Sequence, residues 1–233
     1  MPLPITKSEK ILDLNKQVIL IYGRAKIGKS TLCSMFPKPI FLATESGLNY
    51  LEVFKVNCNN WETFLNACKE LSEGKHEFET IVIDTIDNLV LYCSEYVCRE
   101  NGVNHPSEMP HGKGWHLVTS ELRRVLTKLA SMPQGLVMVS HSMQEEIETK
   151  TKKYNRWTIS ISGKNKNIFL NMVDMILFID SKIETDGEER RIIRTKPSMN
   201  WESGDRSGLL PAELPLDYNA LANCFKKGVK DGK

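Results

Sequence analysis

The segment from Gly23 to Thr31 constrains this chain most. It reads Gly-Arg-Ala-Lys-Ile-Gly-Lys-Ser-Thr and fits the pattern G-x-x-x-x-G-K-[ST]. An apolar run, Val18–Tyr22, precedes it, and a stretch compatible with a helix follows it. This order is typical of a phosphate-binding P-loop, because the loop turns its backbone N–H groups around an anion and the helix presents its N-terminus to the same anion. We therefore predict an α/β fold built around a nucleotide-phosphate site.

Each residue of this segment has a predicted part in holding a nucleotide. Gly23 and Gly28 permit the tight path of the loop. We expect Lys29 to reach the β- and γ-phosphates and the Ser30 hydroxyl to bind Mg²⁺. The predicted nucleotide-binding residues are Gly23, Arg24, Ala25, Lys26, Ile27, Gly28, Lys29, Ser30 and Thr31, with ATP and Mg²⁺ as cofactors. The alternative is a chance Gly-Lys-Ser turn, which the flanking strand and helix disfavour.

Short apolar runs recur along the chain and indicate strands buried on both faces of a parallel sheet. They are Val18–Tyr22, Ile40–Ala43, Ile81–Ile83, Leu136–Val139 and Val173–Ile179, and segments with helical spacing (61–71, 89–97 and 118–129) alternate with them. The charged segment Lys182–Lys196, with a turn at Asp186-Gly187, predicts an antiparallel hairpin. The expected fold is a mostly parallel central sheet flanked by helices, with an antiparallel C-terminal edge.

The size and composition of the chain fit one large domain. The chain has 233 residues, of which 41% are hydrophobic. We assign residues 1–225 to a single domain and expect the basic residues 226–233 to form a disordered tail. The formal charge of +2 argues neither for nor against a nucleic-acid partner. Because no segment approaches the ~18 apolar residues that span a bilayer, and no Cys-x-x-Cys pair or secretory signal occurs, we expect a cytoplasmic protein without a membrane partner.

Two acidic residues that follow apolar runs are candidates for phosphoryl-transfer chemistry. Asp84 ends the run Ile81–Ile83 and is the candidate for holding hydrated Mg²⁺, as the Walker B acid does. An Asp in this place can also cap a helix, but we expect Asp87 to be the cap. Glu45 lies past the second apolar run, at the sheet edge where open α/β sheets bind ligands. It is placed to polarise a water molecule near the γ-phosphate; the alternative is a solvated loop acid.

The fourth apolar run ends in Ser140-His141-Ser142 at the same edge of the predicted sheet. A polar side chain there can sense the γ-phosphate and pass its presence to the next loop. His141 is the candidate for this role, and the alternative is a surface histidine. The predicted catalytic residues are Lys29, Glu45, Asp84 and His141, with Ser30 and Asp84 on the metal ion.

The order of these motifs along the chain resembles that in the RecA-like ATPases, most closely in the short phage-encoded single-strand annealing proteins of the Sak group. The resemblance covers nearly the full chain. It is carried by Gly23–Thr31, Thr44-Glu45-Ser46-Gly47, Ile83-Asp84-Thr85, Val139-Ser140-His141, Thr195-Lys196-Pro197-Ser198 and Glu202-Ser203-Gly204-Asp205-Arg206. It implies that Glu45 is the catalytic glutamate and that His141 couples nucleotide state to a DNA-binding loop. Bacterial recombinases usually have Gln or Asn in that coupling position, so the histidine is a departure.

The same resemblance implies a homo-oligomer, a ring or a filament, with ATP between neighbouring subunits. A basic residue of the neighbour would complete each site, and Lys196 and Arg206 are the candidates. If the protein is phage-encoded, its compartment is the host cytoplasm. A single-strand-binding or replication protein is a further possible partner.

The resemblance also implies binding of single-stranded DNA. The segment Glu145–Asn167 fits this, because its six basic side chains outnumber its three acidic ones and aromatic residues lie between them. The candidate DNA-binding residues are Lys150, Lys152, Lys153, Tyr154, Arg156, Trp157, Lys164 and Lys166. The alternative is a solvated, charged hairpin with Trp157 packed beneath it.

Other classes of site and function have weaker support. Cys98, His105, His111 and His116 could offer four zinc ligands, but their gaps match no standard zinc-finger spacing, so a loop with scattered histidines is the better interpretation. A GTPase is disfavoured because Asn165-Lys166-Asn167-Ile168 lacks the acid of a guanine-reading motif. A nucleotide kinase would need an arginine-rich lid, whereas the basic residues of Glu145–Asn167 are mostly lysine, so this class stays open with less support. The main rival is a nucleotide-gated assembly or interaction protein with little intrinsic turnover.

Overall fold

The computed structural model describes residues 3, 5–8 and 10–230. Its elements, in chain order, are η1 (Leu14–Lys16), β1 (Val18–Gly23), α1 (Lys29–Ser34), β2 (Pro39–Ala43), β3 (Phe54–Asn57), α2 (Trp61–Ser72), β4 (Thr80–Asp84), α3 (Ile86–Glu100), η2 (Pro106–Glu108), η3 (Pro110–Gly112), α4 (Lys113–Ala130), β5 (Gly135–Glu148), β6 (Lys153–Ile159), α5 (Gly163–Met172), β7 (Met175–Ile183), β8 (Glu189–Arg194), β9 (Gly204–Asp205), β10 (Glu213–Pro215) and α6 (Tyr218–Lys230). Within these described residues, no helix is long and apolar enough to cross a membrane.

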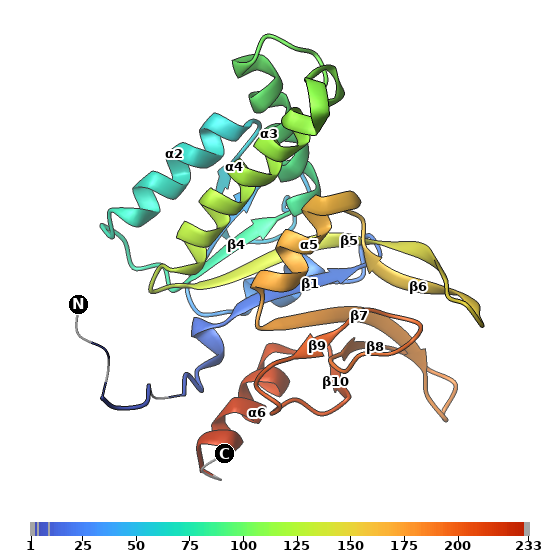
Figure 1. Cartoon of the computed structure of the whole chain (residues 1–233). Coiled ribbons are helices and arrows are strands. Elements are labelled where there is room, and N and C mark those ends of the chain that lie inside the picture. The colour runs from blue at the N-terminus through green and yellow to red at the C-terminus, as the bar shows by residue number, and fades with distance from the viewer. Residues whose placement is uncertain (1–2, 4, 9, 231–233) are drawn as a thin grey trace.

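The strands form one ten-stranded sheet in the order β10-β8-β7-β1-β5-β4-β2-β3, with β6 paired to β5 and β9 paired to β7 (Figure 1). The strands from β7 to β3 in this order pair in parallel, whereas β6, β8, β9 and β10 pair antiparallel. The expected α/β class, with a mostly parallel sheet and antiparallel C-terminal strands, is confirmed.

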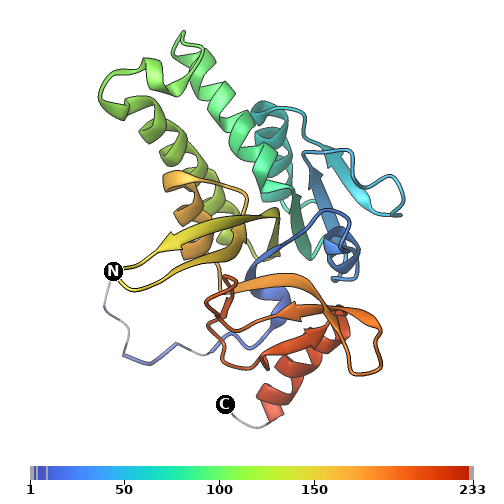
Figure 2. The same cartoon turned by 90° about the vertical axis from the view of Figure 1, so that its right-hand side faces the viewer.

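Side chains of β1 alternate between two apolar cores, because successive residues of a strand point to opposite faces. Leu20 and Tyr22 pack into the core that α2, α3, α4 and α5 cover. Ile19 and Ile21 pack into the core that α1 and α6 cover. Figure 2 shows α2, α3 and α4 on one side of the sheet and α6 on the other. All six residues of β1 are buried, as the solid apolar run predicts.

The parallel strands bring the predicted site residues to one edge of the sheet. Asp84 at the end of β4 pairs with Ala43 of β2 and with Val139 of β5. Gly23 at the end of β1 pairs with His141 of β5. The P-loop, the residues after β2 and the end of β4 therefore meet around β5, which lies between β1 and β4.

Several elements differ from the sequence-based expectations. Strand β5 continues to Glu148 and forms a hairpin with β6 that projects beyond the sheet (Figure 1), which is the charged hairpin that the sequence left open as an alternative. Helix α5 and strand β3 were not predicted. Helix α6 runs to Lys230, so residues 226–230 are helical and not a disordered tail. The helix forms here because Leu221 and Phe225, four residues apart, pack on the second face of the sheet. Residues 231–233 of the expected tail lie outside the described residues.

Candidate nucleotide site

The P-loop surrounds the amino group of Lys29. Its Nζ atom donates to the carbonyl oxygens of Gly23 (3.0 Å) and Arg24 (2.9 Å), and the residue is only 6% exposed. Gly28 has a φ of 109°, which favours glycine, and a Cβ at Gly23 would lie 2.7 Å from the backbone oxygen of Ile179. Burial lowers the pKa of Lys29, and nearby carboxylates, Asp84 first among them, oppose this shift. The ammonium therefore sits where a phosphate could replace the carbonyl oxygens.

The hydroxyl of Ser30 and the carboxylate of Asp84 form the candidate Mg²⁺ site. Ser30 Oγ donates to Asp84 Oδ2 at 2.6 Å, and Asp84 is 3% exposed. Burial raises the pKa of the Asp84 carboxyl, and the hydrogen bond from Ser30 opposes this shift. Both groups offer hard oxygen atoms, and Mg²⁺ in phosphate sites typically takes one or two such protein ligands and fills the remaining positions with phosphate oxygens and water. The donor set therefore fits Mg²⁺.

Glu45 and His141 face each other beside this pair. Glu45 Oε2 lies 3.4 Å from His141 Nε2, and the two side chains are 34% and 35% exposed. Glu45 follows β2, whereas His141 belongs to β5, and β4 separates these two strands in the sheet. The structure thus brings all four predicted catalytic residues to one edge of the sheet, with a carboxylate and an imidazole open to a ligand bound there.

Thr44 fixes the backbone that leads into Glu45, and the sequence did not indicate this role. Its buried Oγ1 donates to Thr85 O at 2.7 Å and accepts from Thr85 N at 2.8 Å. Its own N–H donates to Asp84 O at 2.8 Å. These bonds tie the segment that carries Glu45 to the end of β4. A threonine between an apolar run and an acid was the only signal available in the sequence.

Asp87 does not cap α3, which corrects the expectation from the sequence. The helix begins at Ile86, and Thr85 occupies the capping position without a side-chain hydrogen bond. The Asp87 carboxylate instead accepts from Ser140 Oγ and from His141 N, both at 3.2 Å, and also from the hydroxyl of Ser160. Asp87 can do this because it lies in the first turn of α3, beside the end of β5, where a negative charge suits the helix dipole.

Arg191, which the sequence did not single out, contacts the P-loop from β8. Its Nη1 atom donates to Ile27 O at 3.2 Å, and Arg24 Nη2 donates to Ser181 Oγ at 3.0 Å. An open depression of about 430 Å³ lies between the outer side of the P-loop and the β7–β8 hairpin, and these residues line it. The antiparallel edge of the sheet thus supports the P-loop from outside.

The two candidates for a neighbour's basic residue lie at the opposite end of β7 from the P-loop. Arg206 N donates to Asp174 O, just before β7, whereas Ile179, further along β7, pairs with Gly23. Lys196 Nζ lies 3.5 Å from Asp205, which pairs with Met175 at the start of β7. Neither side chain is near the nucleotide site of its own chain.

The DNA-binding candidates divide into exposed and packed groups. Lys150, Lys152 and Lys153 lie exposed at the tip of the β5–β6 hairpin, and Lys164 is exposed in α5. Lys153 pairs with Glu146 (2.8 Å), Lys166 is 13% exposed and pairs with Glu145 (2.6 Å), and Tyr154 and Arg156 are partly buried on β6. Trp157 stacks with Phe178 at a ring distance of 6.4 Å and packs against the core, which is the alternative that the sequence left open.

Cys98, His105, His111 and His116 all lie in the described part of the chain. Across residues 3, 5–8 and 10–230, no three or more His, Cys, Asp and Glu side chains gather in a way that could hold a metal ion. Cys98 is buried, and its thiol pKa is raised by burial. These four residues therefore do not gather into such a cluster.

Residues 15–207 match a protein family described as an AAA domain. The SPbeta prophage-derived uncharacterized protein YorG of Bacillus subtilis (strain 168) is 25% identical over 188 residues, which cover 78% of this chain and 55% of YorG. The chain thus spans little more than half of that relative's length.

Two solved structures are similar to this chain at low identity, each with a TM-score below 0.5. A KaiC-like protein from Pyrococcus horikoshii OT3 has a TM-score of 0.46 at 12% identity, over 77% of this chain and 78% of that one. The flagellar accessory protein FlaH from Methanocaldococcus jannaschii has a TM-score of 0.47 at 10% identity, over 85% and 84% of the two chains.

Proposed function

The chain belongs to the AAA domain family, whose P-loop implies nucleotide binding, and we propose that it binds ATP with Mg²⁺ and hydrolyses it. One observation carries this proposal: Lys29, the Ser30–Asp84 pair and the Glu45–His141 pair meet at the same edge of the sheet. Phosphoryl transfer requires a cation for the phosphates, oxygen ligands for the metal ion and a group that orients the attacking water. The site offers all three.

Each residue has a distinct task in this proposal. The Lys29 ammonium exchanges the carbonyl oxygens of Gly23 and Arg24 for phosphate oxygens. Mg²⁺, when bound, neutralises charge on the phosphates, and Ser30 and Asp84 would hold it. The Glu45 carboxylate orients a water molecule for attack and accepts its proton. His141 fixes Glu45 through their contact and faces the same ligand.

We also propose that the site is completed by a second copy of the chain. Arg206 and Lys196 lie at the end of β7 opposite the P-loop, so they can reach only a neighbour's nucleotide. Such a head-to-tail contact generates a ring or a filament.

Single-stranded DNA is the effector that the exposed charges favour. The lysines of the hairpin tip, Lys150 and Lys152, and Lys164 of α5 are exposed cations that can contact phosphates. The hairpin also begins directly after His141, so DNA bound there would be connected to the nucleotide site. Annealing or recombination of DNA strands is the process we propose on this basis.

A second candidate function is favoured by the packing of the same hairpin. Trp157 packs against the core, and Lys153 and Lys166 are neutralised by Glu146 and Glu145. Fewer basic and aromatic side chains are therefore free to contact a DNA strand than the composition of Glu145–Asn167 suggested. In the second candidate, ATP assembles the protein or recruits a protein partner, and turnover is incidental.

Steady-state ATP turnover with and without saturating single-stranded DNA separates the two functions. The Lys29→Ala variant, measured in parallel, gives the contaminating background. DNA stimulation that disappears in this variant supports the annealing ATPase. Turnover that depends on Lys29 but ignores DNA, together with no DNA binding at low salt, supports the partner-recruiting protein. Turnover that survives Lys29→Ala contradicts the assignment of the site.

A further inference from the structure

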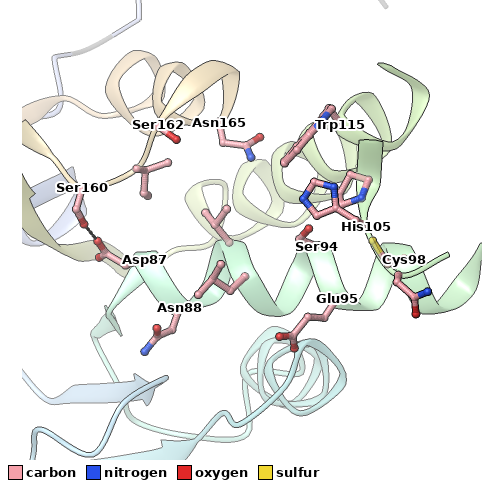
Figure 3. Close-up of a pocket in the computed structure, with 15 residues that line it drawn as sticks. Asp87, Asn88, Ser94, Glu95, Cys98, His105, Trp115, Ser160, Ser162 and Asn165 are labelled. Atoms are coloured by element: carbon pink, nitrogen blue, oxygen red, sulfur yellow. Dashed lines mark hydrogen bonds between the residues drawn. The ribbon is translucent and has the colours of Figure 1, made fainter. Parts of the chain in front are cut away.

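The carboxylate of Asp87 joins three elements that meet beside the nucleotide site. It lies in the first turn of α3 and accepts from Ser140 Oγ and His141 N of β5, each at 3.2 Å. It also accepts from the hydroxyl of Ser160, which follows β6. Figure 3 shows the Asp87 and Ser160 side chains pointing toward each other. Bonds to an ionised acceptor are stronger than bonds between neutral groups, so this junction holds all three elements together.

The donors to Asp87 connect the nucleotide site with the β5–β6 hairpin. His141 contacts Glu45 in the nucleotide site through its side chain and Asp87 through its backbone N–H. Ser160 lies at the base of the β5–β6 hairpin, where its N–H donates to His141 O at 2.9 Å. Asp87 therefore contacts both the residue that faces the nucleotide and the residue from which the hairpin returns to the body of the protein.

Helix α3 also contacts the segment that carries Glu45. Asn88 Nδ2 and the Tyr92 hydroxyl donate to Thr44 O at 3.2 and 3.1 Å. The first two turns of α3 thus hold the segment that carries Glu45, while Asp87 holds the strand that carries His141. Because one helix holds both segments, a shift of His141 relative to Glu45 would move the His141 N–H against the Asp87 carboxylate.

We propose that Asp87 is a positioning residue that couples the nucleotide site to the β5–β6 hairpin. This role rests on the proposed function, since it requires a nucleotide at the P-loop. When the phosphates engage Lys29 and His141, the shift of the His141 N–H passes through the Asp87 carboxylate to Ser160 and so to the hairpin.

A groove beside the junction would respond to the same movement. It has a volume of about 480 Å³ and runs from Asp87 and Ser160 along α3 to His105 and Trp115 (Figure 3). Since Asp87 and Ser160 both line the groove, a shift of Ser160 would change its shape. Nucleotide state would thereby reach a second surface as well as the hairpin.

Hydrogen exchange of the full chain, with and without a saturating non-hydrolysable ATP analogue and Mg²⁺, tests this role. In the wild type, the analogue is expected to protect residues 23–31 and to change exchange in residues 142–162. In Asp87→Asn, which keeps the side-chain size but loses the charge and one acceptor oxygen, residues 23–31 should stay protected. The change in residues 142–162 should fall about fivefold or more, the lower range of a typical coupling between sites.

Two serine variants keep the test decisive if Asp87→Asn folds poorly. Ser160→Ala removes only the far donor at an exposed position and should also lose the hairpin response. Ser162→Ala, exposed two residues further on, is the matched control and should behave as the wild type. A hairpin response that survives Asp87→Asn and Ser160→Ala overturns the role of Asp87, as does an unresponsive hairpin in a wild type whose P-loop is protected. An unprotected P-loop in the wild type contradicts the proposed function, and the coupling with it.

Discussion

Replacing Thr44 by valine should destabilise the protein and slow turnover, because the two side chains have nearly the same shape and only the hydroxyl is lost. Thr85 N, buried at the start of α3, would lose its partner at 2.8 Å, which costs about 1–3 kcal/mol. Thr85 O would lose one bond at 2.7 Å, a net loss of about 0.5–1.5 kcal/mol. Together we expect a loss of about 1.5–4.5 kcal/mol in the free energy of unfolding.

Urea denaturation of the wild type and of Thr44→Val measures this loss as a lower midpoint at an unchanged slope. Thr127→Val, at an exposed position of α4, is the control for the change of side-chain chemistry and should stay within about 0.5 kcal/mol of the wild type. ATP turnover should fall as well, because the residue after Thr44 is Glu45. A Thr44→Val protein as stable as the control would refute the inference that this hydroxyl fixes the end of β4.

Three further predictions concern protonation, the core and the hairpin. Because burial raises the pKa of Asp84, the affinity for Mg²⁺ should rise with pH as this carboxyl loses its proton. The metal-free protein should lose stability over the same pH range, because its folded state still holds a proton that the unfolded state has released. Calorimetry of Asp84→Asn should show neither trend. Tyr22→Phe removes a buried hydroxyl that shares its proton between the backbone oxygens of Glu202 and Trp157 and accepts from Glu202 N, and denaturant unfolding should show a loss of about 1–3 kcal/mol; no loss would contradict the bonding. If DNA binds the hairpin tip, replacing Lys150 and Lys152 by alanine should lower the salt slope of single-strand affinity by about 0.7 per lysine, whereas Lys75→Ala should leave the slope unchanged.

The parallel part of the fold could be predicted because its signals are local. Each buried strand, such as Val18–Gly23, appears in the sequence as a solid apolar run, and a parallel sheet places the ends of such strands at one edge. That rule alone was enough to bring Lys29, Glu45, Asp84 and His141 together. The Ser30–Asp84 contact follows from it as well.

The remaining features depend on contacts between residues far apart in the chain. The second half of β5 and the strand β6 carry charged residues, so no apolar run predicted these strands. The pairing of β5 with β6 and the packing of Trp157 hold the hairpin in place. Lys166 was predicted to be a free cation for DNA, but in the fold it forms an ion pair with Glu145. Asp87 looked like a helix cap because its partners, His141 and Ser160, lie 54 and 73 residues away in the sequence.

ATP binding and single-turnover hydrolysis, measured side by side for the wild type, Lys29→Ala and Glu45→Gln, test the central claim most directly. We expect the wild type to bind and hydrolyse ATP and Lys29→Ala to lose at least about tenfold in affinity, since a charge-assisted bond to the phosphate is removed. Glu45→Gln should bind ATP normally and hydrolyse it about 100-fold more slowly or worse, as for the loss of a general base. Unchanged hydrolysis in Glu45→Gln, or normal binding in Lys29→Ala, would contradict the assignment of this edge of the sheet as an ATP hydrolysis site.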